Sequence, residues 1–283
     1  MLGATEVFAT PNPVPRSFLP NRTSLSRAYR SDALYLRLNL NGTALHPLAV
    51  WAMSELKTWL GNALHQESFL HSLSVTAIAQ LIDPSLKLQV AGLVHDIGKC
   101  RIPGPVMYKR GKPDHLEWAL IQTHPAESVR LLQRFWLPEE FSDLLEIVFK
   151  HHELLDASGY PRRLSGREIC WLTRVLTVAD IIDALIRERS YKEAMPVREA
   201  LAFMYERFVQ TGKIDAGVFS LLEEKEDQLC EIARVMDADT LERRVRHNLR
   251  AASTPLTAVQ RRQWVSHYTG TIYRPLVSSP CAA

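Results

Sequence analysis

The 283-residue sequence predicts an all-α fold, preceded by a short irregular or β segment. Two patterns indicate helices. Apolar residues recur with a 3.6-residue period from Leu48 onward, and helix-start signals recur along the chain. The sequence also lacks the strand–helix alternation and the glycine-rich phosphate loop that are typical of nucleotide-binding α/β folds. We therefore expect a helical body over about residues 48–250.

The first 47 residues differ from the rest of the chain. Residues 1–30 are rich in Pro, Ser, Thr and Arg without apolar periodicity, which is typical of a mobile arm. Leucines then alternate with polar residues over 34–40 and are followed by Asn41-Gly42, a pattern that predicts a short strand and a turn. We interpret residues 1–47 as a basic arm with a short strand segment.

The helices of the body are predicted from periodicity and end signals. Apolar positions predict one helix over about 51–63, a second over 69–81, and a third from Leu86 up to Gly98. Three pairs have the spacing of a capping box: Asp114 with Glu117, Ser165 with Glu168, and Asp239 with Glu242. Pro138 and Pro196 are placed as first helical residues, and Gly212 is placed to end a helix.

Composition indicates an ordinary globular chain, with 46% hydrophobic and 23% charged residues. The four cysteines lie far apart, so there is no CxxC zinc pair and no disulfide framework. No apolar run approaches the ~18 residues of a membrane span. We expect a soluble, cytoplasmic protein with no membrane span.

The net charge of +3 is unevenly distributed: residues 1–30 carry +3, residues 241–283 carry +6, and the middle carries −6. Basic ends can favour nucleic acid, anionic membranes or acidic proteins. Solvated, poorly ordered ends are the simpler interpretation, and we expect no nucleic-acid polymer as a partner.

Histidines and aspartates form an ordered series along the body: His71, His95-Asp96, His124, His151-His152 and Asp180. Imidazole and carboxylate are ligands of divalent transition metals. A single histidine is more often a core residue, but here two adjacent pairs end apolar helices. Neighbouring side chains diverge by about 100° on a helix, so each pair can serve two ions. The pattern predicts a two-metal centre of the kind used for phosphoester displacement.

This series, H…HD…H…HH…D, resembles the HD superfamily of metal-dependent phosphohydrolases, and HHELLDASGYP resembles its HD-GYP subgroup, bacterial cyclic di-GMP phosphodiesterases. The resemblance runs from about Glu67 to Asp215. It implies an HD-domain helical bundle over 48–236, followed by a C-terminal helix and basic tail over 237–283. Ala157, Ser190 and Ile182 depart from the subgroup pattern. Ala157 matters if the loop requires a positive φ at that position.

The resemblance implies two or three divalent transition-metal ions, iron or manganese, and a set of ligands. These are Glu67, His71, His95, Asp96, His124, His151, His152 and Asp180. Asp96 is expected to be catalytic as the carboxylate that bridges two ions. Glu67 lies four residues before His71, so its carboxylate would reach a third ion, although a surface role for Glu67 is the alternative.

The resemblance also implies groups that act on substrate. Lys99 is expected to contact the scissile phosphate, reached by an i,i+4 spacing from His95. Arg189 and Lys192 would hold phosphates. Tyr160 would contact a guanine or pack the loop against the helices. Glu153 and Asp183 are candidates for orienting imidazoles.

The implied activity is hydrolysis of cyclic di-GMP to linear pGpG, with onward hydrolysis to GMP left open. One alternative is an HD phosphohydrolase acting on cyclic GMP-AMP or another nucleotide. The other is a catalytically silent module that binds a cyclic dinucleotide or a diguanylate cyclase, but no ligand of the pattern is missing here. Two further expectations stay open: that diguanylate cyclase domains dock on the loop around Gly159-Tyr160-Pro161 (the GYP loop), and that the protein forms a homodimer.

Overall fold

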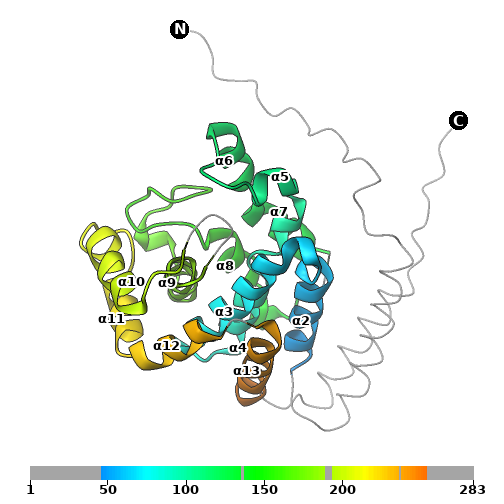
Figure 1. Cartoon of the computed structure of the whole chain (residues 1–283). Helices are drawn as coiled ribbons and strands as arrows, with labels where there is room; N and C mark the ends of the chain where they lie inside the picture. Colours follow the sequence, from blue (N-terminus) through cyan, green and yellow to red (C-terminus); the bar gives the residue numbers. More distant parts are fainter. Residues whose placement is uncertain (1–45, 135–136, 189–192, 236, 254–283) are drawn as a thin grey trace, which may run out of the picture.

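A computed structural model describes residues 46–134, 137–188, 193–235 and 237–253, and these residues form an all-helical body (Figure 1). Within those ranges the one β feature is an isolated bridge between Asp156 and Ser165. The all-α prediction is confirmed. The predicted arm and short strand segment (1–47) lie outside the described residues except for His46 and Pro47, which begin α2.

The helices follow one another through the whole described part of the chain. They are α2 (Pro47–Leu60), η2 (Ala63–His65), α3 (Gln66–Ile82), α4 (Leu86–Val94), η3 (Ile97–Arg101), α5 (Gly104–Met107), α6 (His115–Ile121), α7 (His124–Leu132), η4 (Glu139–Phe141), α8 (Leu144–Lys150), η5 (Gly166–Glu168), α9 (Trp171–Ile186), α10 (Val197–Met204), the single π turn η6 (Tyr205–Val209), α11 (Ala216–Glu223), α12 (Glu226–Arg234) and α13 (Ala238–Ala252).

Helix α3 lies at the centre of the bundle (Figure 1). It packs against α4, α9, α13, α2, α12 and α11, and every residue from His71 to Ala79 is buried. A helix segment that is buried on all sides can present polar side chains to an enclosed site. His71, on this helix, is one of the predicted ligands.

Helix α13 joins the same core. Leu241, Val245 and Leu249 recur on one face and are fully buried in the single hydrophobic cluster. Asn248 donates to Gln80 of α3. The predicted boundary at 236/237 thus separates two parts of the chain that pack together, and the division into domains remains a prediction.

The helix-start signals differ in accuracy. Asp114 and Glu117 form the predicted capping box at the start of α6. The Ser165–Glu168 box also forms, but it opens the one-turn helix η5, and α9 begins only at Trp171.

The third predicted box, Asp239 with Glu242, is wrong. The cap of α13 is Asp237, whose Oδ1 accepts from the backbone N–H of Thr240 at 2.7 Å. Glu242 instead forms ion pairs with Lys57 at 2.8 Å and Arg246 at 2.7 Å. Glu242 therefore pairs with Lys57 of α2, although the capping-box spacing had assigned its carboxylate to the helix start.

Proline and glycine signals are nearly right. Pro138 and Pro196 are the N-caps of η4 and α10, so each helix begins one residue later than predicted. The third predicted helix ends at Val94 rather than at Gly98. Gly212, with φ of 70°, lies just beyond η6 and ends that helical segment as predicted.

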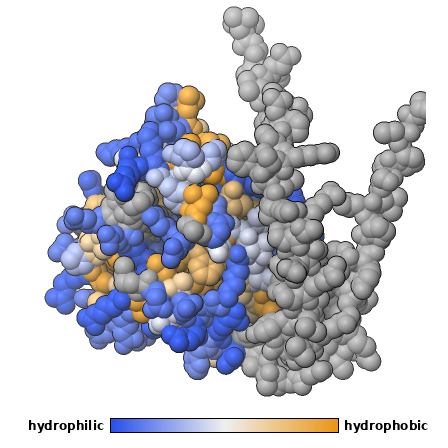
Figure 2. Space-filling view, turned by 45° about the vertical axis from the view of Figure 1, so that its right-hand side comes forward, coloured by the Kyte–Doolittle hydropathy of each residue, from blue (hydrophilic) through white to orange (hydrophobic). Residues whose placement is uncertain are grey.

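The surface is largely hydrophilic, with separate apolar patches on the face shown in Figure 2. Leu116, Trp118 and Leu120 of α6 are exposed, and α6 stands out from the bundle in Figure 1. In the described part of the chain, no helix combines the length and apolar character needed to cross a membrane.

Candidate metal centre

Five elements bring the seven histidine and aspartate residues of the series together. His71 comes from the middle of α3 and Asp180 from α9, and the other five lie at helix ends. Their ligand atoms form two groups, each within 4.8 Å: Asp96, His124, His151 and His152 in one, and His71, His95 and Asp180 in the other. The adjacent pair His95-Asp96 divides between the groups, as the 100° divergence predicts. His151 and His152 fall in the same group.

Asp96 lies between the two groups and is fully buried. Its Oδ1 is 3.2 Å from Nε2 of His124 and 3.8 Å from Nε2 of His151. Its Oδ2 is 3.3 Å from Nε2 of His71 and 3.4 Å from Nε2 of His95. Each carboxylate oxygen therefore faces one group, which is the position that a bridging carboxylate needs.

Hydrogen bonds between Nδ1 and backbone carbonyl groups orient three of the imidazoles. Nδ1 of His95, His124 and His151 each lies 2.6–2.7 Å from the carbonyl oxygen three residues earlier in the chain. A carbonyl only accepts, so each Nδ1 carries a proton, and in the neutral imidazole this leaves the lone pair on Nε2, the nitrogen on the side of the site. The helix ends thus set the tautomer of three ligands at once.

The electrostatics of these imidazoles suit a cation. Burial and the neighbouring imidazoles lower the pKa of His151 well below its usual range, and burial lowers that of His152 to about 3. The lone pairs of His124 and His151 face each other at 3.3 Å. Buried Nε2 of His95 makes no hydrogen bond within the described ranges. Imidazole nitrogens that converge on one space, with burial opposing the protonation of His151 and His152, fit a divalent transition metal better than an empty core.

The carboxylates of the site are held as anions. Burial alone would raise the pKa of Asp96, but Lys99 and the surrounding imidazoles lower it well below its usual range. Burial would also raise the pKa of Asp180. The hydrogen bond with His71 and the charge of His152 outweigh burial, so the pKa of Asp180 lies well below its usual value. Two buried carboxylates therefore offer negative charge to bound cations.

Lys99 reaches the site by a different route from the one predicted. The chain leaves the α-helix after Val94 and continues as η3, so the expected i,i+4 relation with His95 does not form. Lys99 is buried, and its Nζ forms an ion pair with Oδ2 of Asp96, three residues earlier. The side chain nonetheless lies at the shared carboxylate.

A close backbone contact sets the turn that carries His95 and Asp96. A Cβ on Gly98 would lie 2.2 Å from the carbonyl oxygen of His124 and 2.4 Å from the N–H of Ser128. Oγ of Ser128 accepts from the N–H of Gly98 at 2.8 Å and donates to the carbonyl of His95 at 2.6 Å. Because Gly98 has no Cβ, the turn can approach α7 closely, and Ser128 of α7 hydrogen-bonds to the turn at Gly98 and at His95. Sequence reasoning missed Ser128, because its partners lie about 30 residues away.

Asp183 and Glu153 were both expected to orient imidazoles. Asp183 does lie against His71, with Oδ2 2.6 Å from Nδ1. Glu153 does not: its buried carboxylate accepts from the backbone N–H groups of Arg162, at 2.6 Å, and Leu164, at 2.9 Å. Glu153 therefore holds the GYP loop, and the expectation that it orients an imidazole is wrong.

The GYP loop folds over the site through Tyr160. Its ring stacks on His152, with centroids 4.6 Å apart and planes 30° apart, and meets Trp118 of α6 edge-on at 6.0 Å. Ala157 has a φ of 63°, the left-handed conformation that glycine favours. The departure noted at Ala157 thus falls at a position that does require a positive φ.

Other predicted residues lie apart from the two groups. Glu67 is exposed on α3 and shares a small pocket with His71, Lys99 and Tyr108. Ile182 is a core residue of α9. Arg189, Ser190 and Lys192 lie outside the described residues.

Sequence reasoning also missed Arg187, a buried cation next to the site. Its Nε donates to Oδ1 of Asp183 at 2.8 Å, and its other nitrogens donate to Ser74 and to carbonyls of α12 and Val235. The signal was available, since an aspartate followed by arginine at i+4 is a helix ion pair. That pair fixes the carboxylate that orients His71.

A family model and several curated relatives match the sequence of the chain. The family model of the HD domain matches residues 68–218. The chain is 44% identical over 119 residues to the 3'3'-cGAMP-specific phosphodiesterase 3 of Vibrio cholerae, which covers 42% of this chain and 25% of that protein. It is 33% identical over 180 residues to the 3'3'-cGAMP-specific phosphodiesterase 1 of the same organism, covering 61% and 41%.

A third relative is the cyclic di-GMP phosphodiesterase PA4108 of Pseudomonas aeruginosa, 32% identical over 182 residues, which covers 62% of this chain and 42% of that protein. The chain spans less than half the length of these curated relatives. Among solved structures, an HD-GYP-type protein of Bdellovibrio bacteriovorus aligns over 70% of this chain and 69% of its own, with 16% identity and a TM-score of 0.44.

Proposed function

The chain belongs to the HD-domain family, and its similarity to cyclic-dinucleotide phosphodiesterases confirms the HD-GYP-type resemblance. On that premise we propose that it is a metal-dependent phosphodiesterase of cyclic dinucleotides. The observation that carries the proposal is the buried Asp96 carboxylate, which faces histidines of both groups and pairs with Lys99.

The proposed metal ligands are the seven residues of the two groups, with Asp96 contributing to both. Divalent cations held there would activate water and neutralise a phosphodiester. The residues of the chain supply the rest: backbone carbonyls set the imidazole tautomers, and Lys99 offers a buried cation to the anionic diester.

Cyclic di-GMP is the substrate that we propose, with linear pGpG as the first product. Similarity to PA4108 and to the cyclic di-GMP phosphodiesterases of Xanthomonas campestris and Thermotoga maritima supports it. The second candidate, 3'3'-cGAMP, is favoured by the 44% and 33% identity to the two Vibrio cholerae proteins named for that substrate.

A third ion at Glu67 belongs to the same proposal. Glu67 lines a pocket with His71 and Lys99, beside the group that contains His71, and a further cation bound in that pocket would have the Glu67 carboxylate as a ligand. Metal-to-protein stoichiometry tests this part alone: three ions per chain in the wild type and two in Glu67→Ala support it, and two in both proteins contradict it.

Anaerobically prepared protein, loaded with Fe²⁺ or Mn²⁺, tests the activity. Separate assays with cyclic di-GMP and 3'3'-cGAMP, followed by product analysis, identify the substrate and the end product. Asp96→Ala should lose nearly all turnover and at least one bound ion, because it removes the carboxylate common to both groups. Wild-type turnover in Asp96→Ala would contradict the metal assignment, and tight binding without turnover in the wild type would identify a silent binding module.

A further inference from the structure

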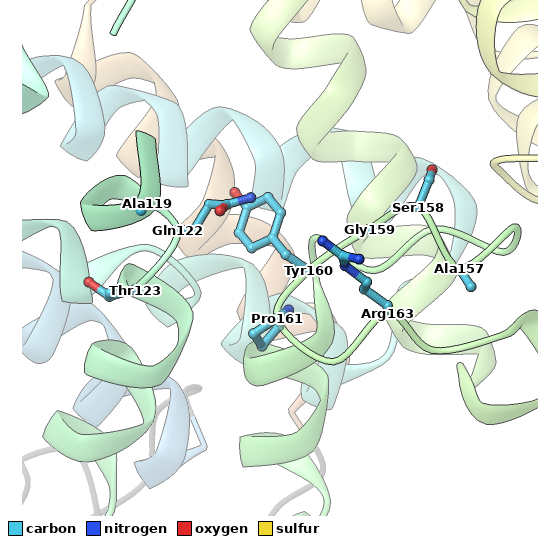
Figure 3. A pocket seen from close by; sticks show the side chains of 9 residues that line it. All are labelled: Ala119, Gln122, Thr123, Ala157, Ser158, Gly159, Tyr160, Pro161 and Arg163. Carbon is cyan, nitrogen blue, oxygen red and sulfur yellow. The ribbon is translucent and has the colours of Figure 1, made fainter. Parts of the chain in front are cut away.

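A polar cavity of about 370 Å³ lies on the side of the GYP loop that faces α6 and the start of α7 (Figure 3). Gln122 and Thr123 line one wall, and Ser158, Tyr160 and Arg163 of the loop line the other. Its volume is in the range of small-molecule sites, roughly 300–1,000 Å³. None of the residues in its lining is among the proposed metal ligands.

The cavity adjoins the candidate metal centre. Tyr160 lines the cavity, and its ring also stacks on His152 at a centroid distance of 4.6 Å. On the opposite wall, Thr123 directly precedes His124, whose Nε2 lies 3.1 Å from that of His152. A molecule whose phosphate occupied the metal centre would therefore have the cavity beside it.

Arg163 is held in an unusual backbone conformation. Its φ is 55°, in the left-handed region that glycine adopts without cost. The buried Glu153 carboxylate accepts from the N–H groups of Arg162 and Leu164, and so holds the backbone on either side of Arg163. A long cationic side chain at such a position points to a function that offsets the strain.

Three polar groups in the cavity lack hydrogen-bond partners. The guanidinium of Arg163, the side-chain amide of Gln122 and the hydroxyl of Tyr160 form no hydrogen bond or ion pair within the part of the chain that the structure describes. In Figure 3 the Arg163 side chain extends toward the part of the cavity where Tyr160 and Gln122 lie. Donors, an acceptor and an aromatic ring thus converge on one space.

We propose that this cavity binds a guanine base of the cyclic dinucleotide, with Arg163 as the residue that selects guanine. Guanine presents two acceptors, O6 and N7, and the planar guanidinium of arginine binds that edge in a bidentate manner. Adenine presents an N6 donor at the same edge, which opposes the arginine. The aromatic ring of Tyr160 offers a surface for the base. This inference rests on the proposed cyclic-dinucleotide activity.

Arg163→Gly tests it, compared on cyclic di-GMP and on cyclic di-AMP, which has no guanine. Glycine accepts the observed φ, so the variant keeps the loop conformation while losing the cation. Loss of a charge-assisted hydrogen bond predicts a ten- to hundredfold fall in kcat/KM for cyclic di-GMP, chiefly through KM, with little change for cyclic di-AMP. Metal content should be unchanged.

Arg162→Ala is the matched control. It removes the same charge from the next position of the loop, but Arg162 is not in the cavity lining, and its guanidinium lies over the Phe149 ring at 4.8 Å. We expect this variant to keep the wild-type preference for cyclic di-GMP over cyclic di-AMP.

The outcomes separate the two proposals. An unchanged preference in Arg163→Gly, or an equal loss in Arg162→Ala, would overturn the guanine site and leave the phosphodiesterase proposal intact. If the wild type hydrolysed neither dinucleotide, the proposed activity would fail. Calorimetry of cyclic di-GMP and cyclic di-AMP binding to the wild type, Arg163→Gly and Arg162→Ala would then still test the guanine site. Weaker cyclic di-GMP binding in Arg163→Gly alone supports the site, and equal binding in all three proteins overturns it.

Discussion

Oδ2 of Asp183 lies 2.6 Å from Nδ1 of His71, while the other oxygen of Asp183 accepts from Arg187 at 2.8 Å. The carboxylate links the central helix α3 to α9 and turns Nε2 of His71 toward Asp96 and Asp180. Because Arg187 holds the carboxylate in place, that carboxylate can orient the buried imidazole of His71.

Asp183→Asn should therefore weaken metal binding without removing a ligand. The amide keeps the shape of the side chain but loses the charge that makes the imidazole a stronger donor, and such changes typically cost ten- to a hundredfold in metal affinity. Manganese titration measures the effect. Asp143→Asn is the control, since that exposed aspartate pairs with Lys87 at the surface. Equal affinity in Asp183→Asn and the wild type would exclude an orienting role.

Glu153→Gln should loosen the GYP loop. A glutamine has one acceptor oxygen for the two N–H groups that Glu153 binds, so one buried group loses its partner, at a cost of about 1–3 kcal/mol in the free energy of unfolding. Hydrogen exchange should quicken at Arg162 or Leu164. Glu146→Gln, at an exposed ion pair with Lys150, should change stability little. Unaltered exchange together with weaker metal binding would instead favour the imidazole-orienting role.

Ala157→Gly should stabilise the protein. Alanine at a φ of 63° carries a cost of roughly 1–2 kcal/mol that glycine avoids, and the greater freedom of glycine in the unfolded chain offsets about half of it. The net gain of roughly 0.5–1 kcal/mol is measurable by urea unfolding. Ala202→Gly, at an exposed position within α10, should show the opposite sign, a loss of about 1 kcal/mol. Destabilisation in both variants would contradict the strain at Ala157.

Stability should fall in acid through His46. Burial lowers the pKa of His46 from 6.5 to about 4, and its Nδ1 must be unprotonated to accept from the N–H of Leu48 at the start of α2. The unfolded chain takes up a proton first, so this stability is fully present above pH 6.5 and is lost as pH falls to about 4. The full loss is on the order of 3 kcal/mol.

His46→Asn isolates that effect, because asparagine can still cap the helix but does not titrate. The difference in unfolding free energy between wild type and variant should be constant above pH 6.5 and shift against the wild type below it. Parallel pH profiles for the two proteins would show that another group carries the acid sensitivity.

Local patterns of the sequence determined the helical body and the identity of the clustered residues. Apolar periodicity reports which face of a helix is buried, and it predicted the existence of α2, α3 and α4, with ends that differ from the observed ones by up to four residues. Polar residues that end apolar helices must find partners in the core, so the pairs His95-Asp96 and His151-His152 could be recognised along the chain. Both pairs do meet in the buried clusters.

Tertiary structure alone decided what each neighbour of the site does. Glu153 and Asp183 look alike in sequence, yet one carboxylate binds loop amides and the other binds an imidazole. Arg163 lies between two residues whose N–H groups bind Glu153, nine and eleven residues earlier in the chain. These roles rest on contacts between residues that lie 9 to 112 positions apart in the sequence, farther than one helical turn. Hydrophobic periodicity and helix caps are short-range signals, and they contain no information about which buried acceptor meets which donor.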